Sequence, residues 1–262
     1  MSVVDGSYEY PMKPEEHASM NLAGGILGQG YQCGQVWGAA LAAGAQAYRL
    51  FGASPRAEAA AVTAAQRLAE SFQARYKSIN CFDVTQLDWK TGQGKQILRF
   101  FLRGGPIRCF GMTADYSRLA MGQLDSLFSS EQEEAPEPPV SCTAELARKV
   151  GASGLHTVMA AGLAGGIGLS GGACGALGAA IWLRELVRSG KGAGTFDQNS
   201  PENNELIERY LESTDYEFEC ARVTGKRFGD VAEHAAYLGS GGCARVIEAL
   251  ATAIKPGSVI SK

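Results

Sequence analysis

The sequence repeats itself once, and this duplication restricts the fold more than any other feature of the chain. Residues 23–26 (AGGI) return as residues 164–167, and Cys33-Gly34 returns as Cys174-Gly175, in both cases 141 positions later. A C-x-x-V-T motif begins at Cys81 and again at Cys220, 139 positions later. Nearly equal offsets over so many residues indicate two copies of one structural unit.

The cysteines follow the same order in both copies. A Gly-Gly pair precedes Cys109 in the first copy and Cys243 in the second, with a shorter connection in the second. The seventh cysteine, Cys142, lies 32 residues before Cys174, and the equivalent place in the first copy is Met1. The first copy therefore carries three cysteines and the second copy four.

The duplication also predicts the domain organisation. We expect a first helical repeat over residues 1–128, a linker over residues 129–140 and a second helical repeat over residues 141–262. The linker stretch SSEQEEAPEPP is polar, acidic and proline-bearing, which is typical of a connection between folded units.

Apolar residues in each copy recur at helical spacing. Ser54-Pro55 and Ser200-Pro201 each combine an N-cap residue with a proline in the first turn, and both precede segments with one apolar face. Helical spacing is also found over residues 36–50, 113–128, 143–150, 176–187 and 245–253. We predict an all-α fold of two tandem helical bundles related by a pseudo-twofold axis, with almost no strand.

Charge and hydropathy exclude some classes of partner. A formal net charge of -3 provides no basic surface for nucleic acid. No apolar run reaches the roughly 18 residues of a membrane span, so no membrane association is expected. The first residues lack the basic and apolar regions of an export signal, and we therefore expect a cytoplasmic protein.

Seven cysteines in a reducing compartment favour metal binding or thiol chemistry over structural disulfides. No two of them form a C-x-x-C pair, so a shared site has to be assembled by the tertiary fold. Three chemistries remain open at this point: an iron–sulfur cluster, a structural zinc site and reversible disulfide formation without a metal.

The cysteine pattern resembles a known family. The run Cys174-Gly175-Ala176, preceded by Cys142 and followed at long range by two single cysteines, is similar to the C-GCAxxG-C-C family of redox-active proteins. The same kind of domain resembles the iron–sulfur part of split-Soret cytochromes, which implies a cluster. The chain has no C-x-x-C-H motif, so covalent haem is not implied.

The resemblance implies the site residues. The primary cluster ligands would be Cys142, Cys174, Cys220 and Cys243, and a second, incomplete set would be Cys33, Cys81 and Cys109. The first copy departs from the family motif because Gln35 replaces its alanine, and the second because Gly178 stands one place early. The implied cofactor is a [4Fe-4S] cluster, with a [2Fe-2S] cluster as the alternative.

These residue types suit a cluster. Iron in a cluster takes soft thiolate ligands, and a glycine beside a cysteine lets backbone N–H groups approach the sulfur. We expect Cys142 and Cys174 near helix starts, where the helix dipole lowers a thiol pKa. A carrier would exchange electrons with a donor or acceptor oxidoreductase, whereas an open iron at the three-cysteine site would bind a small molecule and make the protein an oxidoreductase. A fused duplicate also suggests a dimeric ancestor, and a homodimer of the present chain stays open.

The stretch Gly166 to Gly171 spells G-x-G-x-x-G. A dinucleotide site needs a strand before this motif, whereas the Ala-rich residues 157–163 read as a helix. We therefore interpret the stretch as a glycine-rich bend beside the cysteine site.

Overall fold

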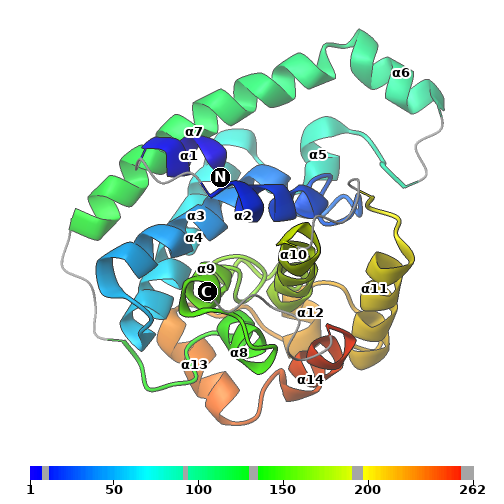
Figure 1. The fold of residues 1–262 in the computed structure, drawn as a ribbon. Helices are drawn as coiled ribbons and strands as arrows, with labels where there is room; N and C mark the ends of the chain where they lie inside the picture. Colours follow the sequence, from blue (N-terminus) through cyan, green and yellow to red (C-terminus); the bar gives the residue numbers. More distant parts are fainter. Residues whose placement is uncertain (8–11, 91–93, 130–134, 191–196, 255–262) are drawn as a thin grey trace.

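The computed structural model describes residues 1–7, 12–90, 94–129, 135–190 and 197–254, and its regular elements are helices (Figure 1). The first copy forms α1 (Ser2–Ser7), α2 (Lys13–Ala18), the 3-10 turn η1 (Ser19–Leu22), α3 (Gly34–Phe51), α4 (Pro55–Tyr76), α5 (Cys81–Thr85), α6 (Gly94–Leu102) and α7 (Gly105–Ser129). The second forms α8 (Cys142–Lys149), α9 (Gly154–Ala161), α10 (Gly175–Gly190), α11 (Pro201–Ser213), α12 (Cys220–Thr224), α13 (Val231–Gly239) and α14 (Ala244–Ala253). The predicted all-α fold of two tandem repeats is confirmed.

Local sequence signals set the helix starts. The Ser54 hydroxyl accepts a hydrogen bond from the Ala57 N–H at the start of α4, and Ser200 caps α11 in the same way through Asn203. Each cap satisfies a backbone donor that has no partner inside the helix. The short helices α5 and α12, and helices α6 and α13, were not predicted from the sequence.

The two copies pack reciprocally. Helix α3 of the first copy lies against α9 of the second, and α10 of the second lies against α2 of the first. Since α9 is the counterpart of α2, and α10 of α3, a twofold rotation exchanges the two contacts. One hydrogen bond joins His156 to Glu15, which occupies the equivalent position 141 residues earlier, at 2.9 Å between Nε2 and Oε1.

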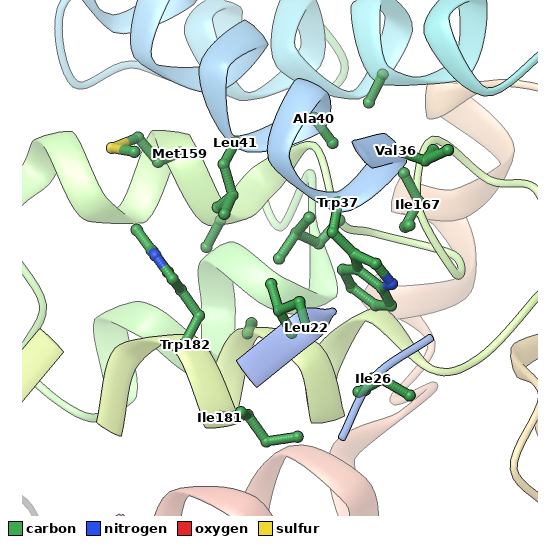
Figure 2. Close-up of a cluster of buried hydrophobic side chains, with 14 of the residues drawn as sticks. Leu22, Ile26, Val36, Trp37, Ala40, Leu41, Met159, Ile167, Ile181 and Trp182 are labelled. Carbon is green, nitrogen blue, oxygen red and sulfur yellow. The ribbon is translucent and has the colours of Figure 1, made fainter. Parts of the chain in front are cut away.

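One hydrophobic core serves both copies. Figure 2 shows Trp37 and Leu41 of α3 together with Met159 of α9 and Trp182 of α10 in a single buried cluster. Small residues allow the helices to approach closely: a Cβ at Gly44 would lie 2.5 Å from the Cα of Met159. The repeats therefore form one packed unit rather than two separate bundles.

The copies differ at α6. In the second copy, α13 buries Val231, His234, Ala235 and Leu238 against the body of the protein. Helix α6 places Ile97, Leu98 and Phe101 at the corresponding positions, but none of its side chains is buried. Figure 1 shows α6 at the far end of the long helix α7, beyond the remaining helices.

The linker falls partly outside the described residues. Residues 130–134 of the predicted linker belong to the undescribed part, and residues 135–140 contain neither helix nor strand. The domain boundaries therefore stay predictions. Among the described helices, none has both the length and the apolar character required to cross a membrane.

Candidate functional site

A short backbone ladder brings two cysteines of each copy together. In the first copy the Cys33 N–H donates to the Ile79 carbonyl at 2.7 Å, and the Cys81 N–H donates to the Tyr31 carbonyl at 2.6 Å. The second copy repeats this pattern at Cys174 and Cys220, at 3.1 and 2.6 Å. An isolated antiparallel bridge lies beside each pair. The two matching motifs found in the sequence are therefore neighbours in space.

The glycine-rich loops lead into these ladders. The loop over residues 166–171 comes after helix α9, which ends at Ala161, so it lacks the strand–turn–helix context of a dinucleotide site. Gly166 and Gly168 have positive φ angles, and a Cβ at either would collide with backbone atoms, at 2.7 Å from Gly172 N and 2.1 Å from Gln66 N. Glycine is required here because the chain turns tightly between α9 and Cys174.

The four cysteines of the second copy lie at four helix starts. Cys142 is the first residue of α8, Cys220 is the first residue of α12, and Cys174 directly precedes α10. Cys243 is the N-cap of α14 and has a left-handed φ of 61°. Only this sharp turn after α13 places Cys243 beside the other three.

The surroundings of the four sulfurs are apolar. Cys142 and Cys220 belong to a small buried cluster with Phe228 and Leu238, to which Val62 of the first copy also contributes. Cys174 lies at the edge of the main core. Helix α13 contributes Val231 and Leu238 to the cluster around Cys142 and Cys220. Cys142, Cys174 and Cys220 are buried, and Cys243 is partly buried.

The four thiols also interact electrostatically. Burial raises the pKa of Cys142 well above its ordinary value, and the charges of Cys243, Cys174 and Cys220 raise that pKa further. Burial and the charge of Cys174 raise the pKa of Cys243 to about 12. Burial and the charges of Cys174 and Cys243 also raise the pKa of Cys220. The fold thus gathers these four thiols into one group.

Backbone donors reach two of the sulfurs. The N–H of Gly165 lowers the pKa of Cys142 in part, although burial dominates and the net shift is upward. The N–H groups of Ala176 and Leu177, in the first turn of α10, act on the pKa of Cys174 in the same direction, again against a larger effect of burial. Such donors stabilise a sulfur that carries negative charge.

The first copy places its three cysteines differently. Cys33 is the N-cap of α3 and Cys81 opens α5, as their counterparts do, whereas Cys109 lies inside α7. The Gly-Gly turns correspond, because Gly105 and Gly242 each contact an aromatic ring, of Phe100 and Tyr237. In this register Pro106 occupies the place of Cys243, and Cys109 comes three residues later in the helix.

The three thiols of the first copy nevertheless form a second group. Burial raises the pKa of Cys33 to about 12, and the charges of Cys81 and Cys109 contribute to the increase. Burial also raises the pKa of Cys81 and of Cys109, while the adjacent Arg108 lowers that of Cys109 in part. Cys33 and Cys109 are only partly buried, so this group is more open to solvent.

Gln35 stands in the first copy where the second copy has Ala176, the small alanine of the family motif. Its Nε2 donates to the Cys109 carbonyl at 3.3 Å and to the Thr113 hydroxyl at 3.0 Å. Its Oε1 is buried and accepts no hydrogen bond within the described part of the chain. From the sequence, Gln35 could be recognised only as a departure from the motif, because Cys109, which it contacts in the fold, lies 74 residues away in the chain.

The expectation that helix dipoles favour thiolates is wrong for the protein on its own. The pKa of each of the seven cysteines is raised, because desolvation by burial outweighs the helix N-termini and the backbone donors. A bound cation would reverse this balance, since a coordinating thiol is deprotonated by the charge of the metal.

Among the described residues no group of three or more His, Cys, Asp and Glu side chains is arranged to hold one metal ion. A tetrahedral zinc site would need four sulfurs at about 2.3 Å from one metal. In a cluster, by contrast, each thiolate binds its own iron, and the donor set in the second copy is of the chemical type that such clusters use.

Comparison with known proteins identifies a family. The model of a family described as "Putative redox-active protein (C_GCAxxG_C_C)" matches residues 1–122 and again residues 141–255. No curated protein and no solved structure matches the chain. The two matched regions cover both copies of the duplicated unit.

Proposed function

Because the chain belongs to the C_GCAxxG_C_C family of redox-active proteins, we propose that it binds an iron–sulfur cluster and transfers single electrons. The ligands in this proposal are Cys142, Cys174, Cys220 and Cys243. The cofactor is a [4Fe-4S] cluster, with [2Fe-2S] as the alternative. The partner is an electron-donor or electron-acceptor oxidoreductase, and the location is the cytoplasm, where thiols stay reduced.

One observation carries this proposal. Four helix starts carry four thiols that interact electrostatically in largely apolar surroundings, and burial holds their pKa values high. Packing alone does not explain four buried thiols at these positions, because small apolar residues would fill the same space equally well. A group that supplies positive charge and soft metal atoms accounts for the residue type, the number and the burial.

Metal and sulfide analysis tests the proposal directly. The full chain is purified without oxygen, and iron, acid-labile sulfide and zinc are measured with an absorption spectrum before and after dithionite. We expect iron and sulfide in similar amounts and a visible absorption band that dithionite bleaches. Zinc alone would favour a structural metal site, and titratable thiols without metal would favour a dithiol protein; either result refutes the cluster.

Two substitutions separate the two groups of cysteines. Cys174→Ser removes a proposed ligand of the second copy, and Cys33→Ser is the matched change in the first copy. We expect Cys174→Ser to abolish the iron of the four-cysteine site, while Cys33→Ser leaves that iron in place. Loss of all iron in the Cys33 variant would contradict independent sites.

A second candidate function concerns the three-cysteine group. A cluster held by these three thiols would have one iron without a cysteine ligand. The Oε1 of Gln35 is buried beside this group and accepts no hydrogen bond within the described part of the chain. A small molecule would bind at this open position, and the protein would then reduce that molecule instead of relaying electrons. In a preparation loaded with more iron than one site holds, Gln35→Ala should change the spectrum of the additional iron but not that of the four-cysteine site.

A further inference from the structure

The segment that carries α6 and the start of α7 has an unusual charge for this protein. Residues 89–114 contain five Lys or Arg residues and no Asp or Glu, although the whole chain has a formal net charge of -3. All of α6 is at least partly exposed. The segment is therefore a local basic region on an acidic protein.

A cavity of about 530 Å³ lies between this segment and α5. Three arginines line it: Arg99 on α6, Arg103 directly after the end of α6, and Arg108 on α7. Arg99 and Arg103 are four residues apart, about one helical turn, so they project from the same side. The Arg108 guanidinium is held in place because it donates to the Val84 carbonyl of α5.

Two of the three guanidinium groups keep their hydrogen-bonding capacity. Within the described part of the chain, neither Arg99 nor Arg103 forms a side-chain hydrogen bond or ion pair. The one acidic residue in the lining is Asp88, whose Oδ1 accepts the Lys90 N–H at 2.9 Å. With three arginines and one aspartate among the described lining residues, the lining carries a net positive charge.

The rest of the lining suits a small organic ion. Phe82 and Phe100 provide apolar contact area at the sides of the cavity, and Thr85, Gln86 and Gln96 provide further polar groups. Guanidinium groups bind carboxylate and phosphate oxygens in a paired, planar geometry. The chemistry of the cavity therefore matches a small molecule with carboxylate or phosphate groups.

The cavity adjoins the three-cysteine group. Phe82 follows Cys81 in the chain, and Arg108 precedes Cys109. In the second copy the positions of Arg99 and Arg103 are occupied by Ala236 and Ser240. Two of the three arginines of the cavity therefore have no basic counterpart in the second copy, whereas Arg108 corresponds to Arg245.

We propose that the cavity under α6 binds a small carboxylate- or phosphate-bearing molecule beside the three-cysteine group. Anion binding itself does not require a metal. The inference rests on the proposed function in one respect, which is that the bound anion would be the ligand or substrate of a cluster at the three-cysteine group.

Isothermal titration calorimetry of the full chain with citrate and with inorganic pyrophosphate tests the binding. We expect saturable binding of at least one probe, weakened by added sodium chloride because salt screens an exposed charged site. Replacing both free guanidiniums, in Arg99→Gln/Arg103→Gln, should weaken binding about tenfold or more, as expected when hydrogen bonds to charged groups are lost. Arg67→Gln is the matched control, since Arg67 is an exposed arginine on α4, away from the cavity.

Tryptophan fluorescence tests whether the ligand binds in this cavity. Trp89 is 45% exposed and its ring lies 6.0 Å from that of Phe100, whereas Trp37 and Trp182 are fully buried. Binding in the cavity should change the tryptophan fluorescence, and Trp89→Phe should remove that change without weakening the calorimetric binding.

Three results would overturn the inference. They are no binding of either probe, equal affinity in the double variant, and capture by phosphatidylglycerol vesicles without binding of either soluble anion. Thermal unfolding of the double variant should match that of the native chain, so a folding defect cannot imitate loss of the site. The two proposals can fail separately. If the purified protein contains no iron but binds the anion, the cluster is refuted and the anion site is supported. If it contains iron and sulfide but binds neither anion, the anion site is refuted and the cluster is supported.

Discussion

At the scale of single residues, burial decides the chemistry of the titratable groups. His234 is 1% exposed, its Nδ1 lies 3.1 Å from the Val140 carbonyl, and burial lowers its pKa. In the unfolded chain a histidine titrates near its ordinary pKa of about 6.5. Protonation therefore favours the unfolded state.

The sign of this effect gives a prediction. The contribution of His234 to the free energy of unfolding is complete above about pH 7.5 and declines as the pH falls through about 6.5, by at most about 1.4 kcal/mol per pH unit. Urea unfolding from pH 8 to pH 5 measures it. In His234→Phe this part of the decline should disappear, and an unchanged pH profile in that variant would contradict the assignment.

Gln32 joins the two copies through buried hydrogen bonds. Its Nε2 donates to the Gly166 carbonyl at 2.9 Å, and its Oε1 accepts the Ala173 N–H at 3.0 Å. Both partners lie in the loop before Cys174, so a residue next to the first cysteine group positions the second.

Gln32→Ala should therefore destabilise the protein. The change leaves the buried Ala173 N–H unpaired, which costs about 1–3 kcal/mol, while the Gly166 carbonyl still accepts a hydrogen bond from the Ser170 hydroxyl. Denaturant unfolding at neutral pH measures the loss. Gln66→Ala, which removes an exposed hydrogen bond to the Gly229 carbonyl, is the control and should stay within about 0.5 kcal/mol of the native chain.

At the scale of elements, close approach of α3 to α9 holds the copies together. The contact at Gly44 leaves no room for a side chain, since a Cβ there would lie 2.6 Å from the Val158 carbonyl oxygen. Backbone atoms cannot move aside as a flexible side chain would, so the two helices would have to separate.

Gly44→Ala should cost about 1–3 kcal/mol of stability through this overpacking. Gly122→Ala in α7 is the matched control, because a Cβ there meets no atom within 4 Å. The control should gain about 0.5–1 kcal/mol from helix propensity. The two variants are compared by their urea midpoints, and a stabilised Gly44 variant would refute the close contact.

At the scale of the whole molecule, the two copies share their main core. The main cluster combines side chains of α3 and α4 with side chains of α9, α10 and α14, and Val62 of the first copy packs in the cluster that contains Cys142 and Cys220. Separation would expose this apolar surface to water.

Residues 1–128 and 141–262, produced as separate chains, should each lack a cooperative unfolding transition. Mixing them should restore helical circular dichroism and a one-to-one complex in size-exclusion chromatography, because each half supplies the apolar surface that the other buries. A cooperative, monomeric second half would show instead that this copy is an independent domain.

The duplication, the helical class and the main helix starts could be predicted from the amino-acid sequence. These follow from local information: offsets between matching motifs, apolar spacing, and serine–proline caps such as Ser54-Pro55. The order of the cysteines in each copy was also readable, and it carried the family resemblance.

Other features of the cysteine groups depend on the three-dimensional fold. It placed Cys109 inside a helix although Cys243 caps one, and it brought the Gln35 side chain to the Cys109 carbonyl. It also reversed the expected direction of the cysteine pKa shifts, because desolvation depends on everything packed around a thiol and not on its neighbours in the chain. Burial, register at the Gly-Gly turn and the exposure of α6 all arise from contacts between distant segments, and no local pattern encodes them.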